Sequence, residues 1–196
     1  LSGSFTNDPQ EHTLTIDWGD GTVDNIAVPQ GTFDLSTLNI THTYLDDDPT
    51  GDASNTYNVT VTIEEDANPT ASLTDTSLSV TVDNVAPVLA NVNVTSTIDE
   101  DGVVTLTGDI VDPGTQDTFT LDVDWGDGSG IETFTYAAGT TSFTETHQYL
   151  DDNPTATSSD AYTVSLTLTD DDTGVATDSL SVTVDNVAPV LANVNV

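Results

Sequence analysis

Acidic side chains gather in short runs between the apolar segments of the chain, where loops are expected. The candidate runs are Asp46, Asp47 and Asp48; Glu64, Glu65 and Asp66; Asp151 and Asp152; and Asp170, Asp171 and Asp172. A further run, from Asp99 to Asp101, is interpreted as a hairpin turn that lacks the remaining ligands of an EF-hand loop. Calcium takes roughly 6 to 8 oxygen ligands from carboxylates, amide oxygens and backbone carbonyls, and loops rich in Asp and Asn supply these groups. The runs therefore predict calcium binding, with a solvated acidic turn as the alternative for any one of them.

Catalysis is the competing chemistry for paired carboxylates, and the sequence argues against it. A glycosidase needs two carboxyl groups with separated pKa values in one cleft, whereas here the acidic pairs recur in both halves of the chain. The sequence has no G-x-S-x-G, no H-E-x-x-H and no Cys nucleophile. It also has no Lys or Arg that could stabilise an anionic transition state. We therefore predict that the protein is not an enzyme.

The charge of the chain requires cations from outside it. The 196 residues include 34 Asp and Glu and no Lys or Arg, which gives a formal net charge of −34. Self-repulsion at this charge opposes compaction unless external cations balance it. Nucleic acids and anionic membranes are bound through Lys and Arg, and no apolar run approaches the 18 or so residues of a membrane span. The composition argues against nucleic acid and membrane insertion in this segment and favours calcium as the cofactor.

The elements that must position the acidic loops occur twice. The segment from Ser77 to Val94, SLSVTVDNVAPVLANVNV, returns unchanged from Ser179 to Val196. The motifs DWGDG and H-x-Y-L-D-D also occur twice and in the same order. A repeat of about 100 residues made of short alternating segments indicates one sandwich per copy rather than a short-repeat solenoid. The chain is therefore expected to contain tandem copies of one module.

The expected domains follow from the repeat. Residues 1–84 are the first copy, which lacks its own opening strand; residues 85–186 are the second copy; and residues 187–196 are the opening strand of a third. We interpret this frame as a window of a longer array. The alternative is a fibre subunit whose last strand completes a neighbouring subunit by donor-strand complementation.

Period-two alternation of apolar and polar residues identifies the strands. In the second copy, apolar residues alternate from Val104 to Ile110, from Phe119 to Trp125, from Tyr162 to Leu168 and from Leu180 to Val184. The first copy repeats the pattern, and its last strand has Leu78, Val80 and Val82 on one face. Such alternation is typical of strands with one buried face. We predict an all-β protein of tandem immunoglobulin-like sandwiches with essentially no helix.

Five motifs in fixed order resemble polycystic kidney disease-type (PKD) domains of bacterial and archaeal surface proteins. In the second copy they are VDWGDG, HQY, YTVSLTL, DDDTG and SVTV. In the first copy they are IDWGDG, HTY, YNVTVTI, a departing hairpin EEDANPTAS, and SVTV. The resemblance covers nearly the whole chain. It implies an immunoglobulin-like sandwich, a secreted or cell-surface location, and spacing, adhesion or ligand contact rather than catalysis.

The resemblance also implies a calcium site between modules, because some PKD domains bind calcium where a linker Asn meets an Asp-containing loop. The matching residues are Asp83, Asn84, Asp112 and Asp117, and they form the leading candidate site. In the first copy the matching loop has Asp8 and Glu11, and Asp185 with Asn186 would serve a third module. The acidic runs at Asp46–Asp48, Asp151–Asp152 and Asp170–Asp172 remain weaker candidates.

Three other features are interpreted as structural. The two DWGDG segments, at Asp17 and Asp124, are typical of a turn that needs Gly at positive φ and Asp bonded to its own backbone. His42 and His147 precede a Tyr by two residues and lack a second His or Cys nearby in sequence, so packing is favoured over metal binding. The Trp of each copy continues an inward face and is expected in the core.

The function predicted from these features is that of a non-catalytic, calcium-stiffened repeat in an adhesin stalk or a cell-surface fibre. Its partners would be calcium ions and adjacent repeats or neighbouring copies in a fibre. A carbohydrate- or protein-binding module, with surface glycans as ligands, is the alternative, and it would need exposed aromatic residues on one face. The absence of Cys fits a bacterial or archaeal surface protein.

Overall fold

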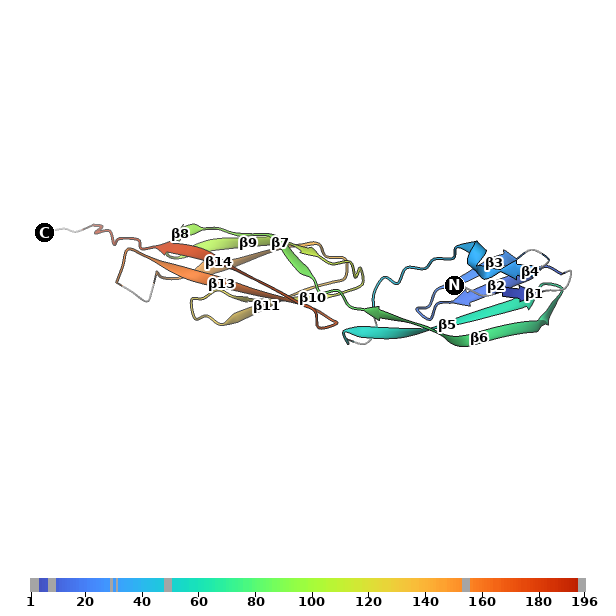
Figure 1. The fold of residues 1–196 in the computed structure, drawn as a ribbon. Helices are drawn as coiled ribbons and strands as arrows, with labels where there is room; N and C mark the ends of the chain where they lie inside the picture. Colours follow the sequence, from blue (N-terminus) through green and yellow to red (C-terminus); the bar gives the residue numbers. More distant parts are fainter. Residues whose placement is uncertain are drawn as a thin grey trace. The chain divides into compact units, whose positions relative to one another are not determined.

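The computed structural model describes residues 4–6, 10–28, 30, 32–47, 51–152 and 156–193. Two units are distinguished, Leu1–Asp83 and Asn84–Val196, and each is described by itself. Both consist of β-strands (Figure 1). In the described residues the only helical element is a 3-10 turn, η1 (Leu35–Leu38), and no helix is long and apolar enough to cross a membrane. These observations confirm the all-β prediction.

The alternating segments of the second unit form two sheets. One sheet has the strand order β11-β10-β13-β14-β8, and the other has the order β12-β9-β7. The strands are β7 (Val88–Val94), β8 (Thr97–Asp99), β9 (Gly102–Val111), β10 (Phe119–Asp124), β11 (Ile131–Tyr136), β12 (Ser142–Tyr149), β13 (Ser159–Asp170) and β14 (Val175–Asp185). Successive side chains of a strand point to opposite faces, so each sheet turns one apolar face to the other.

The connections between these strands define the fold class. β13 and β14 form a long antiparallel hairpin, with Ser159 opposite Asp185 at its open end. β8 pairs in parallel with the last residues of β14. The chain crosses from one sheet to the other between β9 and β10 and again between β11 and β12. Two sheets of mainly antiparallel strands joined by such crossings make an immunoglobulin-like sandwich.

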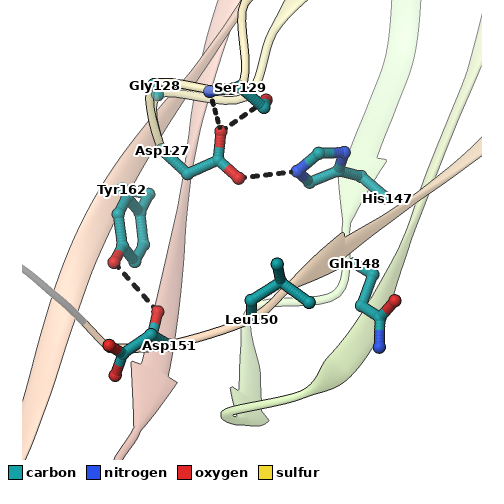
Figure 2. Close-up of a pocket in the computed structure, with 9 residues that line it drawn as sticks. Asp127, Gly128, Ser129, His147, Gln148, Leu150, Asp151 and Tyr162 are labelled. Carbon is teal, nitrogen blue, oxygen red and sulfur yellow. Dashed lines mark hydrogen bonds and ion pairs between the residues drawn. The ribbon is translucent and has the colours of Figure 1, made fainter.

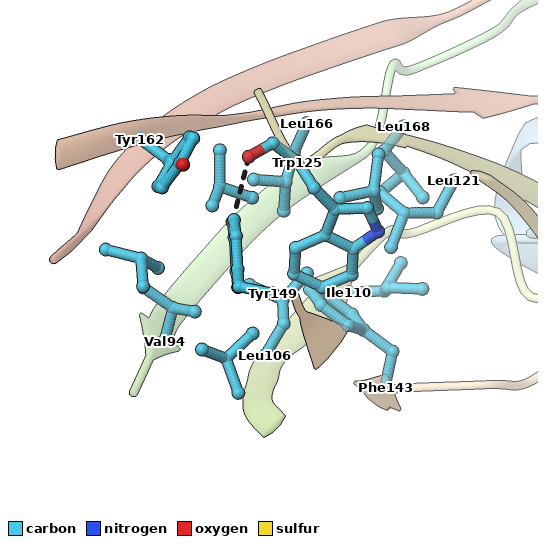
Figure 3. Packing of buried hydrophobic residues seen from close by; sticks show 14 of the residues in the cluster. Val94, Leu106, Ile110, Leu121, Trp125, Phe143, Tyr149, Tyr162, Leu166 and Leu168 are labelled. Atoms are coloured by element: carbon cyan, nitrogen blue, oxygen red, sulfur yellow. Dashed lines mark hydrogen bonds between the residues drawn. The ribbon is translucent and has the colours of Figure 1, made fainter. Parts of the chain in front are cut away.

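The core of the second unit lies between the two sheets (Figure 3). Trp125, immediately after β10, and Tyr149, the last residue of β12, are fully buried. The Tyr149 hydroxyl donates a hydrogen bond of 2.8 Å to the carbonyl of Trp125, which ties β12 to the end of β10. This bond satisfies the one polar atom of a buried Tyr side chain, as burial of a hydroxyl requires.

The first unit contains a four-stranded sheet of order β3-β2-β5-β6 and a separate pair, β1 with β4. Its strands are β1 (Ser4–Thr6), β2 (His12–Asp17), β3 (Val23–Val28), β4 (Thr32–Asp34), β5 (Ser54–Glu65) and β6 (Asn68–Asp83). Leu14, Ile16, Trp18, Val28 and Val59 are its buried core. β2, β5 and β6 match β10, β13 and β14 of the second unit in sequence and in pairing.

The same apolar residues are buried in one unit and exposed in the other, and this corrects one prediction. Leu78 and Val80 of β6 are 36% and 37% exposed, although an inward face was expected for them. Val182, the counterpart of Val80 in β14, is fully buried. In the second unit β8 pairs with β14, and β7 contacts β14. The described residues of the first unit provide no counterpart of β7 or β8 beside β6, so its apolar side chains stay accessible.

Candidate metal centre

The loop that joins β9 to β10 brings two carboxylates to one end of the second unit. Asp112 accepts a hydrogen bond of 2.8 Å from the backbone amide of Gly114, an Asx turn that folds the loop tightly. The Asp117 carboxylate then lies directly over Gly114, and a Cβ atom at position 114 would collide with both of its oxygens. Asp117 is only 1% exposed. Gly114 is therefore needed for space at this turn.

The tip of the β13–β14 hairpin supplies a third carboxylate at the same end. One oxygen of Asp170 accepts hydrogen bonds from the amides of Asp172, at 3.1 Å, and Gly174, at 2.5 Å. Its other oxygen accepts a 2.9 Å hydrogen bond from the side-chain amide of Asn84. Asn84 also donates to the carbonyl of Asp172 at 3.3 Å. The first residue of the unit is thus fastened to the hairpin tip.

These loops converge on one point. Asp112, Asp117 and Asp170 each offer a carboxylate oxygen, and these oxygens lie within 4.8 Å of one another. Calcium binds its oxygen ligands at 2.3–2.6 Å, so oxygens on opposite sides of one ion are about 5 Å apart. We call Asn84, Asp112, Asp117 and Asp170 the linker site. The three carboxylates belong to buried or half-buried residues, and carboxylate oxygens suit a hard cation.

A second acidic group lies at the other end of the same unit. Glu100, in the turn between β8 and β9, and Asp151 and Asp152, in the loop after β12, each place a carboxylate oxygen within 4.8 Å of the others. We call these three residues the exit cluster. Asp152 is 6% exposed. Burial raises the pKa of its carboxyl, and a hydrogen bond to Asp151 and the nearby charges of Glu100 and Asp151 raise it further.

The structure arranges the leading candidates differently from the sequence-based expectation. Asn84, Asp112 and Asp117 belong to one cluster or border it, but the third carboxylate is Asp170, which the sequence placed in a separate, weaker group. Asp83 is the exposed last residue of β6 and pairs with Ser54. The assignment of these residues to calcium stays a prediction.

The remaining candidates occupy varied positions. Asp171 is exposed and accepts a 2.7 Å hydrogen bond from the Thr118 amide, whereas Asp172 is 2% exposed. Asp185 ends β14, and the amide of Asn186 donates to the carbonyl of Ser158 at 3.1 Å. Asp8 and Asp48 lie outside the described residues.

The first unit buries the acidic pair that matches Asp151 and Asp152. Asp46 is 9% exposed and Asp47 is 2% exposed. The Tyr57 hydroxyl donates to the Asp46 carbonyl at 3.2 Å, and the side-chain amide of Asn55 donates to the Asp47 carbonyl. At the β5–β6 turn, the Asp66 carboxylate accepts a 2.9 Å hydrogen bond from Thr13, and the Asp66 amide donates to the carbonyl of Glu11 at 3.0 Å.

Glu100 is the functional candidate that sequence reasoning missed. It lies in the turn from Asp99 to Gly102, whose sequence lacks the remaining ligands of an EF-hand loop. The turn meets the loop after β12 only in the folded sandwich, where Gln148 donates to the carbonyl and the carboxylate of Asp101 at 3.1 and 2.8 Å. No sequence spacing links two segments that are about fifty residues apart.

Each DWGDG turn holds a histidine, and Figure 2 shows the arrangement in the second unit. In the second unit Asp127 accepts hydrogen bonds from Ser129 through one oxygen, and its other oxygen lies 2.9 Å from Nε2 of His147. The ring of His147 stacks on Trp125 with 4.7 Å between centroids. Burial disfavours the Asp127 carboxylate, but the hydrogen bonds from Ser129 and His147 outweigh it and lower the pKa of Asp127. The first unit repeats this arrangement with Asp20 and His42, 2.6 Å apart.

The structural interpretation of these turns is confirmed. The structure adds the pairing of each histidine with a turn carboxylate, which the sequence did not reveal. Gly19 and Gly126 have φ values of 84° and 78°, as the turn requires. The histidines pack on the tryptophans, as expected, and also pair with the turn carboxylates. Beside His147 lies an open hollow of about 620 Å³, which Leu150, Asp151 and Tyr162 also line (Figure 2).

No protein-family model and no curated protein matches this chain. Among solved structures, it is similar to the PKD domain of an M14-like peptidase from Thermoplasmatales archaeon SCGC AB-540-F20, with 20% identity and a TM-score of 0.40 over 52% of this chain and 98% of that chain. It is also similar to the FN1–FN3 domains of chicken CNTN1, with 9% identity and a TM-score of 0.38 over 91% of this chain and 56% of that chain.

Proposed function

We propose that the chain is a non-catalytic structural repeat of an extracellular surface protein, such as an adhesin stalk or a fibre shaft, and that calcium stiffens it. The observation that carries the proposal is the convergence of Asp112, Asp117 and Asp170 at the end of the second unit where the chain enters it. Asn84, the first residue of that unit, donates to one of these carboxylates. A cation there would be held by residues that also hold the linker.

Electrostatics supports a cation at this position. Three carboxylates crowd together in a chain with a net charge of −34 and no Lys or Arg, so no side chain of permanent positive charge can neutralise them. Taking an ionised carboxylate out of water is costly unless it is paired or bound to a metal. Calcium would supply the missing positive charge and accept oxygen ligands in flexible geometry. Its loss would leave the carboxylates repelling one another.

The mechanical role follows from where the linker site lies. Asn84 begins the linker Asn84–Pro87 that leads into β7, and the tip of the β13–β14 hairpin touches this linker, because Gly174 packs against Ala86. An ion that fastens the two loops would reduce the freedom of the linker. Extracellular modules bind calcium at about 10⁻⁴ to 10⁻³ M. The repeat would therefore be stiff in millimolar calcium and flexible without it.

Calcium titration followed by small-angle scattering and thermal unfolding tests the proposal. We expect calcium to raise the melting temperature and to narrow the distribution of scattering dimensions, and EDTA to reverse both effects. Asp117→Asn should weaken calcium binding in calorimetry by at least about tenfold, since even the loss of an outer-shell partner of a metal costs that much. Asp178→Asn, which removes an exposed carboxylate of β14, is the matched control for charge alone.

The proposal fails if EDTA changes neither the melting temperature nor the scattering curve of the calcium-loaded protein. It also fails if Asp117→Asn and Asp178→Asn have equal effects on calcium binding, because general screening of the negative charge would then explain the response.

One observation favours a binding module as the second candidate. The hollow beside His147 has a volume of about 620 Å³, within the range of ligand pockets, and Leu150 at its edge is 73% exposed. Hydroxyl-rich ligands such as surface glycans would find the Asp127 and Asp151 carboxylates there as hydrogen-bond acceptors. Glycan-array binding that Leu150→Ala abolishes would support this candidate, and an array without signal would remove it.

A further inference from the structure

The exit cluster contains a carboxylate that is buried more deeply than an acidic turn requires. Asp152 is 6% exposed, and its Oδ2 atom has no hydrogen-bond partner in the described part of the chain. A buried oxygen without a hydrogen-bond partner destabilises the fold, and it does so more strongly when it is charged. A solvated surface loop would turn such a side chain outward. Asp152 instead stays among the carboxylates of Glu100 and Asp151.

Hydrogen bonds fasten the two loops that carry the exit cluster. The Glu100 amide donates to the carbonyl of Asp185 at 2.9 Å, and Gln148 fastens the same turn through Asp101. On the other side, the Tyr162 hydroxyl donates to the carbonyl of Asp151 at 3.1 Å (Figure 2). These bonds prevent the two loops from separating to relieve the repulsion of the carboxylates.

The first unit repeats the burial of this residue. Asp47 is the counterpart of Asp152 in the motif H-x-Y-L-D-D, and it is 2% exposed. In both units a tyrosine hydroxyl from the next strand of the chain donates to the carbonyl of the preceding Asp. The acidic pair and its tyrosine contact thus occur in both copies of the module.

We propose that the exit cluster is a second calcium site, formed by Glu100, Asp151 and Asp152, at the end of the second unit where the chain leaves it. Three carboxylate oxygens within 4.8 Å of one another match the preference of calcium for hard oxygen ligands. The ion would supply the partner for Oδ2 of Asp152. The proposal does not depend on the linker site.

The exit cluster also contacts the segment that follows β14. The amide of Val187 donates a 2.8 Å hydrogen bond to Oε1 of Glu100, which is itself a member of the cluster. An ion bound by Glu100 would therefore fix residues 185–187 to the β8–β9 turn. Calcium in the exit cluster would order the segment after β14, just as an ion in the linker site would order the segment before β7.

The test follows the amide resonances of the ¹⁵N-labelled 196-residue chain during calcium titration. The Val187 amide reports on the exit cluster, and the Gly174 amide, bonded to Asp170, reports on the linker site. We expect saturable shifts of both. Asp152→Asn and Glu100→Gln should each weaken the Val187 response by at least about tenfold and leave the Gly174 response unchanged. Asp117→Asn should do the reverse.

Two outcomes would overturn the second site. One is a Val187 resonance that does not move up to about 10 mM calcium, well above the affinity range of extracellular modules. The other is a shift that sodium chloride of equal ionic strength reproduces, or that persists in both exit-cluster variants. Glu100 is half-buried, so Glu100→Gln keeps the test valid if Asp152→Asn fails to fold. If the Gly174 resonance does not shift with calcium, that result counts against the linker site and not against the exit cluster.

Discussion

At the scale of single residues, small side chains decide whether carboxylates can crowd together. Gly114 and Gly174 each lie against a carboxylate of the linker site, and neither has a positive φ. They are therefore glycines because of space and not because of backbone conformation. A site that depends on such contacts is sensitive to one added methyl group.

Gly114→Ala is expected to displace the Asp117 carboxylate, because the new Cβ atom would occupy its position. We expect a loss of about 1–3 kcal/mol in the free energy of unfolding, the usual cost of overpacking, together with weaker calcium binding. Urea unfolding and calorimetry measure the two effects. Unchanged calcium affinity in a folded Gly114→Ala variant would contradict the position assigned to Asp117.

The paired Asp127 and His147 should make stability depend on pH. The pKa of Asp127 is lowered in the folded state, so its contribution is present above the unfolded pKa of about 4 and is lost as pH falls through the lower folded value. We expect Asp127→Asn to lower the free energy of unfolding by about 1 kcal/mol at pH 7 and by less at pH 3.

The measurement is urea unfolding of both proteins at several pH values between about 3 and 7, a range that spans the unfolded pKa. The difference between the wild-type protein and the variant isolates Asp127 from the many other carboxylates. A difference that grows as the pH falls below the unfolded pKa of about 4 would have the wrong sign and would rule out this role for the pair.

At the scale of elements, strand β14 and its counterpart β6 show that the burial of a residue depends on which strands surround it. Residues 179–185 repeat residues 77–83 without a change. Val182 is fully buried in a strand that pairs with β8 and contacts β7, while Val80 is 37% exposed. The alternation predicts an apolar face for both strands, but burial requires a second sheet to cover that face.

This pair provides a matched experiment. Val182→Ala should reduce the free energy of unfolding of the second unit by about 2 kcal/mol, because it opens a cavity in a closed core. Val80→Ala, in the same local sequence, should cost the first unit less than about 1 kcal/mol, because surface changes have small effects. Each unit contains one tryptophan, Trp18 in the first and Trp125 in the second. When one of them is replaced by Phe, the fluorescence of the other reports the unfolding of its own unit. Equal costs would contradict the difference in burial.

At the scale of the whole molecule, the net charge of −34 sets the conditions under which the chain is stable. Sodium chloride should raise the melting temperature by screening repulsion between carboxylates. Calcium chloride at equal ionic strength should raise it further, because specific binding at ten times Kd adds about 1.4 kcal/mol per site. Differential scanning calorimetry in the two salts makes the comparison. Identical melting temperatures would leave screening as the only effect of calcium.

The amino-acid sequence by itself determined the class of structure and the chemistry available to it. Alternation with period two predicted the strands from Phe119 to Trp125 and from Tyr162 to Leu168, because the direction of a strand side chain depends only on its own position in the chain. The DWGDG turns were equally readable, since an Asx turn is made by residues two positions apart. The net charge of −34, and with it the need for external cations, also follows from the sequence alone.

Only the tertiary structure decided which carboxylates meet. Asp170 joins Asp112 and Asp117, and Glu100 joins Asp151 and Asp152, because loops from different strands end at the same edge of a sandwich. It also decided that Val182 is buried and Val80 is not. Contacts between segments far apart in the chain depend on how the two sheets are stacked and connected, and no local pattern of residues encodes that arrangement by itself.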